Sequence, residues 1–106
     1  MSKRWLFLLA GLGTLGTTPA HAQDIEAGRM IAQTWCSRCH AVDAQSHGAQ
    51  NDAVPSFLAI AKMSSTTQMP LTVFLSTSHG RMPDFSLTRT EIRNVSAYIL
   101  SLRGGY

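Results

Sequence analysis

The sequence predicts an all-α fold of about four helices in one small domain. Three observations indicate this class. Apolar residues recur at three- and four-residue steps, helix start and stop signals bound these segments, and no stretch alternates between apolar and polar residues as a strand would. A chain of 106 residues has room for a single domain once its N-terminal leader is set aside.

The first predicted helix covers residues 25–35 and leads directly into a pair of cysteines. Asp24 is its expected N-cap, and its apolar face is expected to carry Ile25, Gly28, Ala32 and Trp35. A polar loop follows over residues 41–54. Pro55 then precedes a short helix predicted over residues 56–63.

Two further helices complete the predicted fold. Pro70 suits the first turn of a helix about two turns long, which Gly80 is expected to end. Thr88 and Glu91 have the spacing of a capping box at the start of the last helix, and Gly104 is its expected stop. The apolar stripe of this helix consists of Ile92, Val95, Ile99 and Leu102.

Residues 1–22 have the pattern of a cleaved signal peptide. Lys3 and Arg4 precede an apolar run over residues 5–15, and the segment closes with Ala20-His21-Ala22. Glycines and threonines interrupt the run, which is shorter than the roughly 20 apolar residues of a membrane span. We therefore expect a secreted, periplasmic domain over residues 23–106, with an uncleaved membrane anchor as the alternative.

The charge of the mature chain is nearly balanced. The leader carries two of the nine lysines and arginines, so seven remain against six acidic residues. This balance gives no reason to expect nucleic acid or a membrane surface as a partner. A domain this small usually needs disulfides, a metal or a cofactor for stability, and its two cysteines are too close together for a stabilising disulfide.

Cys36-Ser37-Arg38-Cys39-His40 is the Cys-x-x-Cys-His signature of c-type haem attachment. On a helical turn, residues i, i+3 and i+4 face the same way, so two thiols can form thioethers with one porphyrin edge while the imidazole reaches the iron. Three alternatives are a thioredoxin-like redox pair, a zinc site completed by His47 or His79, and a plain disulfide.

Met82 is the expected sixth ligand of the iron. It lies in the irregular segment 79–84 between two predicted helices, and Pro83 stiffens the backbone beside it. A thioether opposite an imidazole raises the reduction potential, as suits an electron carrier. Met69 and His79 are the alternative ligands. Met30 and Met63 are expected to fill the core, and His47 to be a solvated loop residue.

In this order, the haem motif, Met82-Pro83 and the last helix resemble the small class I cytochromes c of bacterial periplasms. The resemblance covers nearly all of residues 23–102 and implies helices packed around one haem, with the first and last helices crossing where Gly28 meets Tyr98. It also implies that the Pro55 carbonyl accepts a hydrogen bond from His40. The family often has an aromatic residue where this chain has Ala32, and Trp35 is expected to supply the missing bulk.

The resemblance implies a monomeric carrier of single electrons between a redox donor and a redox acceptor protein, such as a dehydrogenase, an oxidase or a membrane cytochrome complex, with no enzymatic activity. Arg38 and Arg81 are expected near the rim of the haem. The residues expected to surround the ring are Phe57, Leu58, Leu71, Phe74, Phe85 and Ile99. The alternatives are an electron-transfer subunit of a periplasmic dehydrogenase, and a haem enzyme or sensor whose sixth ligand is labile.

Overall fold

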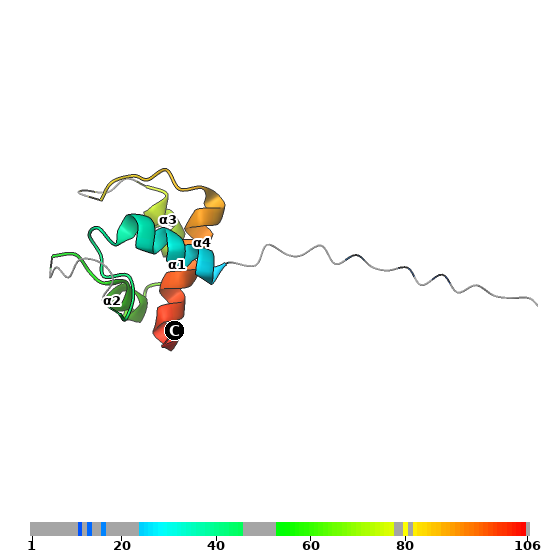
Figure 1. Cartoon of the computed structure of the whole chain (residues 1–106), viewed down its shortest axis with the longest axis horizontal. Helices are drawn as coiled ribbons and strands as arrows, with labels where there is room; N and C mark the ends of the chain where they lie inside the picture. The colour runs from blue at the N-terminus through cyan, green and yellow to red at the C-terminus, as the bar shows by residue number, and fades with distance from the viewer. Residues whose placement is uncertain are drawn as a thin grey trace, which may run out of the picture.

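A computed structural model describes residues 24–45, 53–77, 80 and 82–105, together with three isolated glycines of the leader. Its helices are α1 (Ile25–Ile31), a π-helical turn η1 (Ala32–Cys36), α2 (Phe57–Lys62), α3 (Gln68–Leu75), α4 (Arg89–Ser101) and a 3₁₀ turn η2 (Leu102–Gly104) (Figure 1). The all-α prediction is confirmed, since the described ranges contain helices and no strand. The leader, His47, His79 and Arg81 lie outside these ranges.

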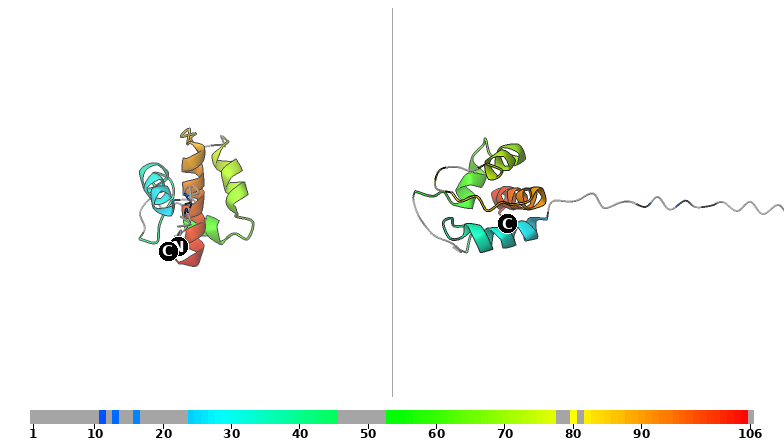
Figure 2. Two further views of the ribbon diagram at one scale, coloured as in Figure 1. Left: turned by 90° about the vertical axis from the view of Figure 1, so that its right-hand side faces the viewer. Right: turned by 90° about the horizontal axis from the view of Figure 1, so that it is seen from above.

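Helix α4 is the centre of the fold. It packs against α1, α2 and α3, and Figure 2 shows it between α1 on one side and α3 on the other. Helix α1 crosses α4 at Gly28, where a Cβ atom would come within 2.0 Å of the Asn94 carbonyl oxygen and 3.0 Å of Tyr98 Cβ. The predicted contact between Gly28 and Tyr98 is therefore confirmed, because only glycine allows two backbones to approach this closely.

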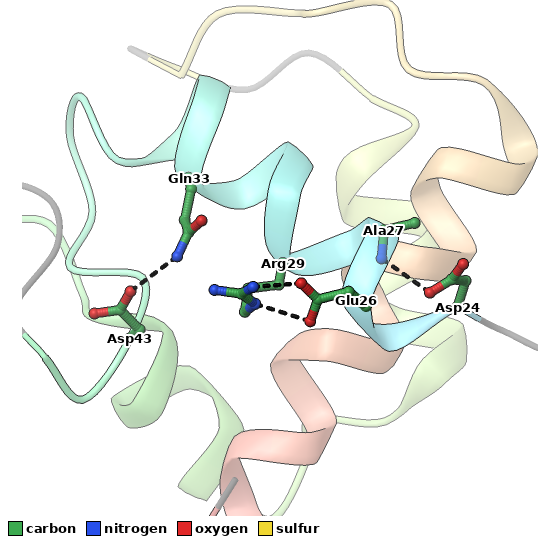
Figure 3. Close-up of polar contacts among 6 residues, drawn as sticks. All are labelled: Asp24, Glu26, Ala27, Arg29, Gln33 and Asp43. Carbon is green, nitrogen blue, oxygen red and sulfur yellow. Dashed lines mark hydrogen bonds and ion pairs between the residues drawn. The ribbon is translucent and has the colours of Figure 1, made fainter.

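The start of α1 agrees with the sequence, whereas its last turn does not. Asp24 is the N-cap, and its side chain accepts a hydrogen bond of 2.9 Å from the Ala27 N–H (Figure 3). The wider π-helical turn then shifts the buried face by one residue. Ala32 and Cys36 are buried, whereas Trp35 is 44% exposed. The expectation that Trp35 lies on the buried face and supplies core bulk is wrong.

Helix α2 is fixed at both ends by side chains. The Ser56 hydroxyl accepts a hydrogen bond from the Ala59 N–H at its start. At its other end, the Arg103 guanidinium donates to three backbone carbonyls, that of Ala61 (2.6 Å) in the last turn and those of Met63 (3.2 Å) and Thr66 (2.8 Å) beyond it. These bonds satisfy carbonyls that the end of a helix leaves unpaired, and they attach the C-terminal turn to the segment after α2.

Helix α3 has the predicted length of about two turns, but it ends before the predicted stop at Gly80. Pro70 lies in the first turn, as predicted, but the helix stops at Leu75 and not near Gly80. The hydroxyls of Ser76 and Thr77 donate back to carbonyls one turn earlier, at 2.5 and 2.9 Å. Such local bonds compete with the helical pattern and explain the early end.

Helix α4 begins with the predicted capping box. The Thr88 side chain accepts from the Glu91 N–H, and the Glu91 carboxylate accepts from the Thr88 N–H. At the other end, the left-handed residue that terminates the helix is Gly105, with φ of +80°, and not Gly104. A left-handed cap strongly favours glycine, and either Gly104 or Gly105 could take that conformation, so the sequence alone does not say at which of the two the helix ends.

The buried apolar core is built from η1, α2, α3, α4, η2 and the loop residue Val42, and Ile25 and Ile31 of α1 pack against it. Its members are Ala32, Cys36, Val42, Phe57, Ala61, Leu71, Val95, Tyr98, Ile99 and Leu102. The prediction that Met30 and Met63 fill the core is wrong. Met30 lies on the face of α1 opposite Gly28, and Met63 lies just beyond α2, so both side chains are exposed. Within the described ranges, no helix has the length and apolar character needed to cross a membrane.

Candidate functional site

The two cysteines and His40 lie on one turn of backbone at the end of the first helix. Cys36 is the last residue of η1, and its carbonyl accepts hydrogen bonds from the N–H groups of Cys39 (3.2 Å) and His40 (2.9 Å). Both thiols are free, with Cys36 buried at 8% exposure and Cys39 exposed. The backbone of residues 36–40 therefore has the hydrogen bonds of a helical turn.

The environment of Cys36 differs from that of a redox-active dithiol. Burial raises the pKa of the Cys36 thiol to about 11, so the thiol is neutral at physiological pH. A thioredoxin-like cysteine needs a lowered pKa, which supplies the reactive thiolate. The described residues also hold no cluster of three histidine, cysteine or acidic side chains suited to a metal ion.

His40 is oriented by the backbone of the segment that precedes α2. Its Nδ1 atom lies 2.6 Å from the Pro55 carbonyl oxygen, so the hydrogen bond expected from the family resemblance is present. A carbonyl only accepts, so Nδ1 carries the proton and Nε2 keeps the lone pair that binds a metal. The Phe57 ring lies beside the imidazole with a centroid separation of 5.4 Å.

The residues that follow His40 are also fixed in place. The Ala41 carbonyl accepts from the Phe57 N–H at 2.9 Å, and the Val42 carbonyl accepts from the buried Tyr98 hydroxyl at 2.6 Å. Burial raises the pKa of Tyr98, which keeps the donor protonated. The chain directly after His40 is thus attached to both α2 and α4.

A polar contact adds a further connection at this end of α1. Gln33 Nε2 lies 3.3 Å from an Asp43 carboxylate oxygen, as Figure 3 shows together with the Glu26–Arg29 ion pair. It joins the π-helical turn to the chain just beyond His40.

Met82 lies on the wall of a cavity next to the C-terminal end of α3. The cavity has an empty volume of about 290 Å³, part of which is open solvent, and its lining residues are Phe74, Leu75, Thr77, Met82, Pro83, Asp84, Phe85 and Leu87. Met82 is half-buried. By contrast, the other methionines of the described ranges, Met30, Met63 and Met69, are 60, 54 and 75% exposed.

The chain matches a known family over most of its length. Residues 23–99 match the family described as cytochrome c oxidase, cbb3-type, subunit III. The chain belongs to this family of c-type cytochromes. It is also similar to cytochrome c-552 of Bradyrhizobium diazoefficiens, with 38% identity over 87 residues, which cover 82% of this chain and 83% of that protein. No solved structure matches the chain.

The cytochrome is a haem-based electron carrier, and the geometry of its signature turn fits that group. A haem of the c type needs two thiols and one imidazole on one turn, and the sequence signature and backbone hydrogen bonds of residues 36–40 are compatible with that need. The lone pair on His40 Nε2 suits iron. The hydrogen bond from His40 Nδ1 to the Pro55 carbonyl leaves Nε2 as the nitrogen available to a metal.

Two parts of the cytochrome's site follow no sequence pattern. Trp35 packs against Phe85 with a centroid separation of 5.6 Å and an interplanar angle of 41°, which places the segment after Met82 against the helix that carries Cys36. The other part is the contact of Arg103 with the segment after α2. Each contact joins residues far apart in the chain. The sequence signals for them are only the charge of Arg103 and the aromatic character of Trp35 and Phe85, and neither signal names the partner.

The residues expected around the haem ring have several different positions. Phe57, Leu71 and Ile99 are core residues of the cytochrome, whereas Phe74 and Phe85 line the cavity beside Met82. Of the other expected ring and rim residues, Leu58 and Arg38 are exposed, and Arg81 lies outside the described residues.

Proposed function

We propose that this chain is a periplasmic carrier of single electrons with one haem attached covalently through Cys36 and Cys39. His40 and Met82 are its axial ligands. His40 lies on the same turn as both thiols. The observation that carries the proposal is the hydrogen bond from His40 Nδ1 to the Pro55 carbonyl. When bound, the haem supplies an iron centre that accepts or donates one electron at a time.

The protein's part in this function is to bind and orient the group. The thiols prevent its loss outside the cytoplasm, and the Pro55 carbonyl fixes the imidazole plane and strengthens Nε2 as a donor. Met82 supplies a soft thioether that favours the reduced state. With both axial positions filled by side chains, no substrate binds the metal, which supports a carrier and not an enzyme.

The proposed location and partners depend on the leader and on the family. The pattern of residues 1–22 supports export and cleavage after Ala22, and the family match starts at residue 23. We propose redox proteins as donor and acceptor and a monomeric state. The nearly balanced charge of the mature chain supports neither nucleic acid nor a membrane surface as a partner.

The description of the family supports a second candidate function, that of an electron-transfer subunit within a cytochrome oxidase. Gel filtration of a native periplasmic extract, followed at a haem absorption wavelength, separates the two. A free carrier elutes near the size of the mature chain, whereas a subunit elutes with a much larger complex.

The proposed ligands are tested by replacing Met82 and, as a matched control, Met69. The oxidised protein should show the weak far-red band of a methionine bound to ferric iron. Met82→Ala should abolish the band and allow carbon monoxide to bind the reduced protein, whereas Met69→Ala should change neither. Loss of the band in Met69→Ala alone contradicts the proposed ligand. Absence of the band from the unaltered protein, together with ready carbon monoxide binding, indicates an enzyme or sensor.

A further inference from the structure

We propose that Trp35 and Phe85 are positioning residues for the sixth ligand, and that their contact keeps Met82 directed at the iron. The proposal rests on the proposed function, because it takes Met82 as that ligand. Trp35 directly precedes Cys36, and Phe85 follows Met82 by three residues. Their rings meet with a centroid separation of 5.6 Å. The contact therefore joins the helical turn that carries Cys36 to the segment that carries Met82.

The Trp35 side of the contact is rigid. The π-helical turn brings Trp35 out of the core, and side chains on both sides of it bond back to the helix. Thr34 Oγ1 donates to the Met30 carbonyl at 2.8 Å, and Ser37 Oγ donates to the Gln33 carbonyl at 2.6 Å. π-Helical turns inside helices are frequent at functional sites, and here the turn has a defined effect, since it presents an indole outside the core.

The Phe85 side belongs to a segment with little regular structure of its own. Residues 83–88 are neither helix nor strand. A local turn shapes them, in which an Asp84 carboxylate oxygen accepts from the Ser86 N–H at 2.7 Å and Ser86 has a φ of +52°. A left-handed φ is unfavourable for serine, so this turn persists because other contacts stabilise it.

The packing on the two faces of this segment is unequal. Towards α3, the segment borders the partly open cavity lined by Met82, Pro83 and Phe85. Towards η1, the Phe85 ring packs on the indole of Trp35. Tilted aromatic pairs stabilise beyond the area they bury. Since Phe85 lies only three positions after Met82, loss of this contact gives the methionine more freedom to leave the iron.

The measurement is competition by imidazole for the sixth position of the ferric holoprotein at fixed pH. The nitrogen of imidazole takes the position as the methionine sulfur leaves, and the iron stays ferric. Trp35→Leu and Phe85→Leu should each tighten apparent imidazole binding roughly two- to tenfold, the range that corresponds to one aromatic pair. The double variant should tighten it by no more than the stronger single variant, because the two side chains act together.

Two control variants separate positioning from general destabilisation. Trp35→Phe keeps an aromatic ring at the site and should leave imidazole binding within a factor of about two of the unaltered protein. Val73→Ala shortens an exposed apolar side chain on α3 that does not line the cavity beside Met82, and it should not change imidazole binding. Far-UV circular dichroism of each holoprotein confirms that the fold is retained, which is expected because Trp35 is largely at the surface.

The outcomes distinguish this inference from the proposed function. If Met82→Ala abolishes the far-red band but Trp35→Leu and Phe85→Leu bind imidazole as the unaltered protein does, the positioning role is overturned and the ligand stands. Equal tightening in Val73→Ala also overturns it. Absence of the far-red band from the unaltered protein overturns the ligand itself.

Discussion

Replacement of Gly28 by alanine tests the packing on which this small fold depends most. The new Cβ would lie 2.0 Å from the Asn94 carbonyl oxygen, about 1.4 Å inside the 3.4 Å at which ordinary contacts begin. The clash is with backbone, so α1 and α4 must separate. Overpacking of this kind lowers the free energy of unfolding by up to about 3 kcal/mol, and the higher helix propensity of alanine offsets about 1 kcal/mol of that loss. We therefore expect a net loss of about 2 kcal/mol.

The assay is thermal or denaturant unfolding of the mature holoprotein. For a domain of this size, a loss of about 2 kcal/mol corresponds to a fall of roughly 8–16 °C in Tm. Gly104→Ala is the matched control, since a Cβ atom there meets no atom within 4 Å and its φ is not in the left-handed region. Its Tm should stay the same or rise slightly. If Gly28→Ala unfolds within about 0.5 kcal/mol of the unaltered protein, the close crossing of α1 and α4 is contradicted.

Three further substitutions have expected effects on the free energy of unfolding, measured by urea titration of the holoprotein. Tyr98→Phe leaves the buried Val42 carbonyl without its donor and should cost about 1–3 kcal/mol; no loss would refute the importance of that bond. Thr88→Ala removes the capping box formed with Glu91 and should cost about 1 kcal/mol, whereas Thr88→Ser should keep most of it. Arg103→Met removes the donor of three carbonyls after α2 and should cost about 1–3 kcal/mol, and a cost below 0.5 kcal/mol would show that water replaces the guanidinium.

The sequence predicts best those features that depend on local chemistry. The capping box at Thr88 and the N-cap at Asp24 follow from residue types at fixed short spacings, and both are present. The three side chains proposed to bind haem also belong to one turn, so their spacing can be predicted without knowledge of the rest of the fold. The bond from His40 to Pro55 spans 15 residues, and the resemblance to a family predicted it where spacing alone does not.

Features that depend on competition or on distant partners were not predicted correctly. A periodic pattern extends α3 as far as the next glycine, but the hydroxyls of Ser76 and Thr77 bond to the last turn and end the helix at Leu75. A regular helix puts Trp35 on the same face as Ala32, but one π-helical turn moves Cys36 into that place.

The exposed methionines show a related limit of sequence patterns. Periodicity identifies an apolar face but does not say which neighbour covers it, so Met30 and Met63 were expected in the core. The same limit applies to the aromatic pair of Trp35 and Phe85, whose members are 50 residues apart in the sequence and meet only in the folded chain.

The most direct test of the central proposal is the intact mass and absorption spectrum of the mature protein, made in a host able to attach haem and then denatured. The account predicts a mass equal to residues 23–106 plus one haem, no free thiols, and a haem spectrum that persists after denaturation and responds to reduction. A colourless chain with two free thiols, or one whose haem is removed by denaturation, would contradict it.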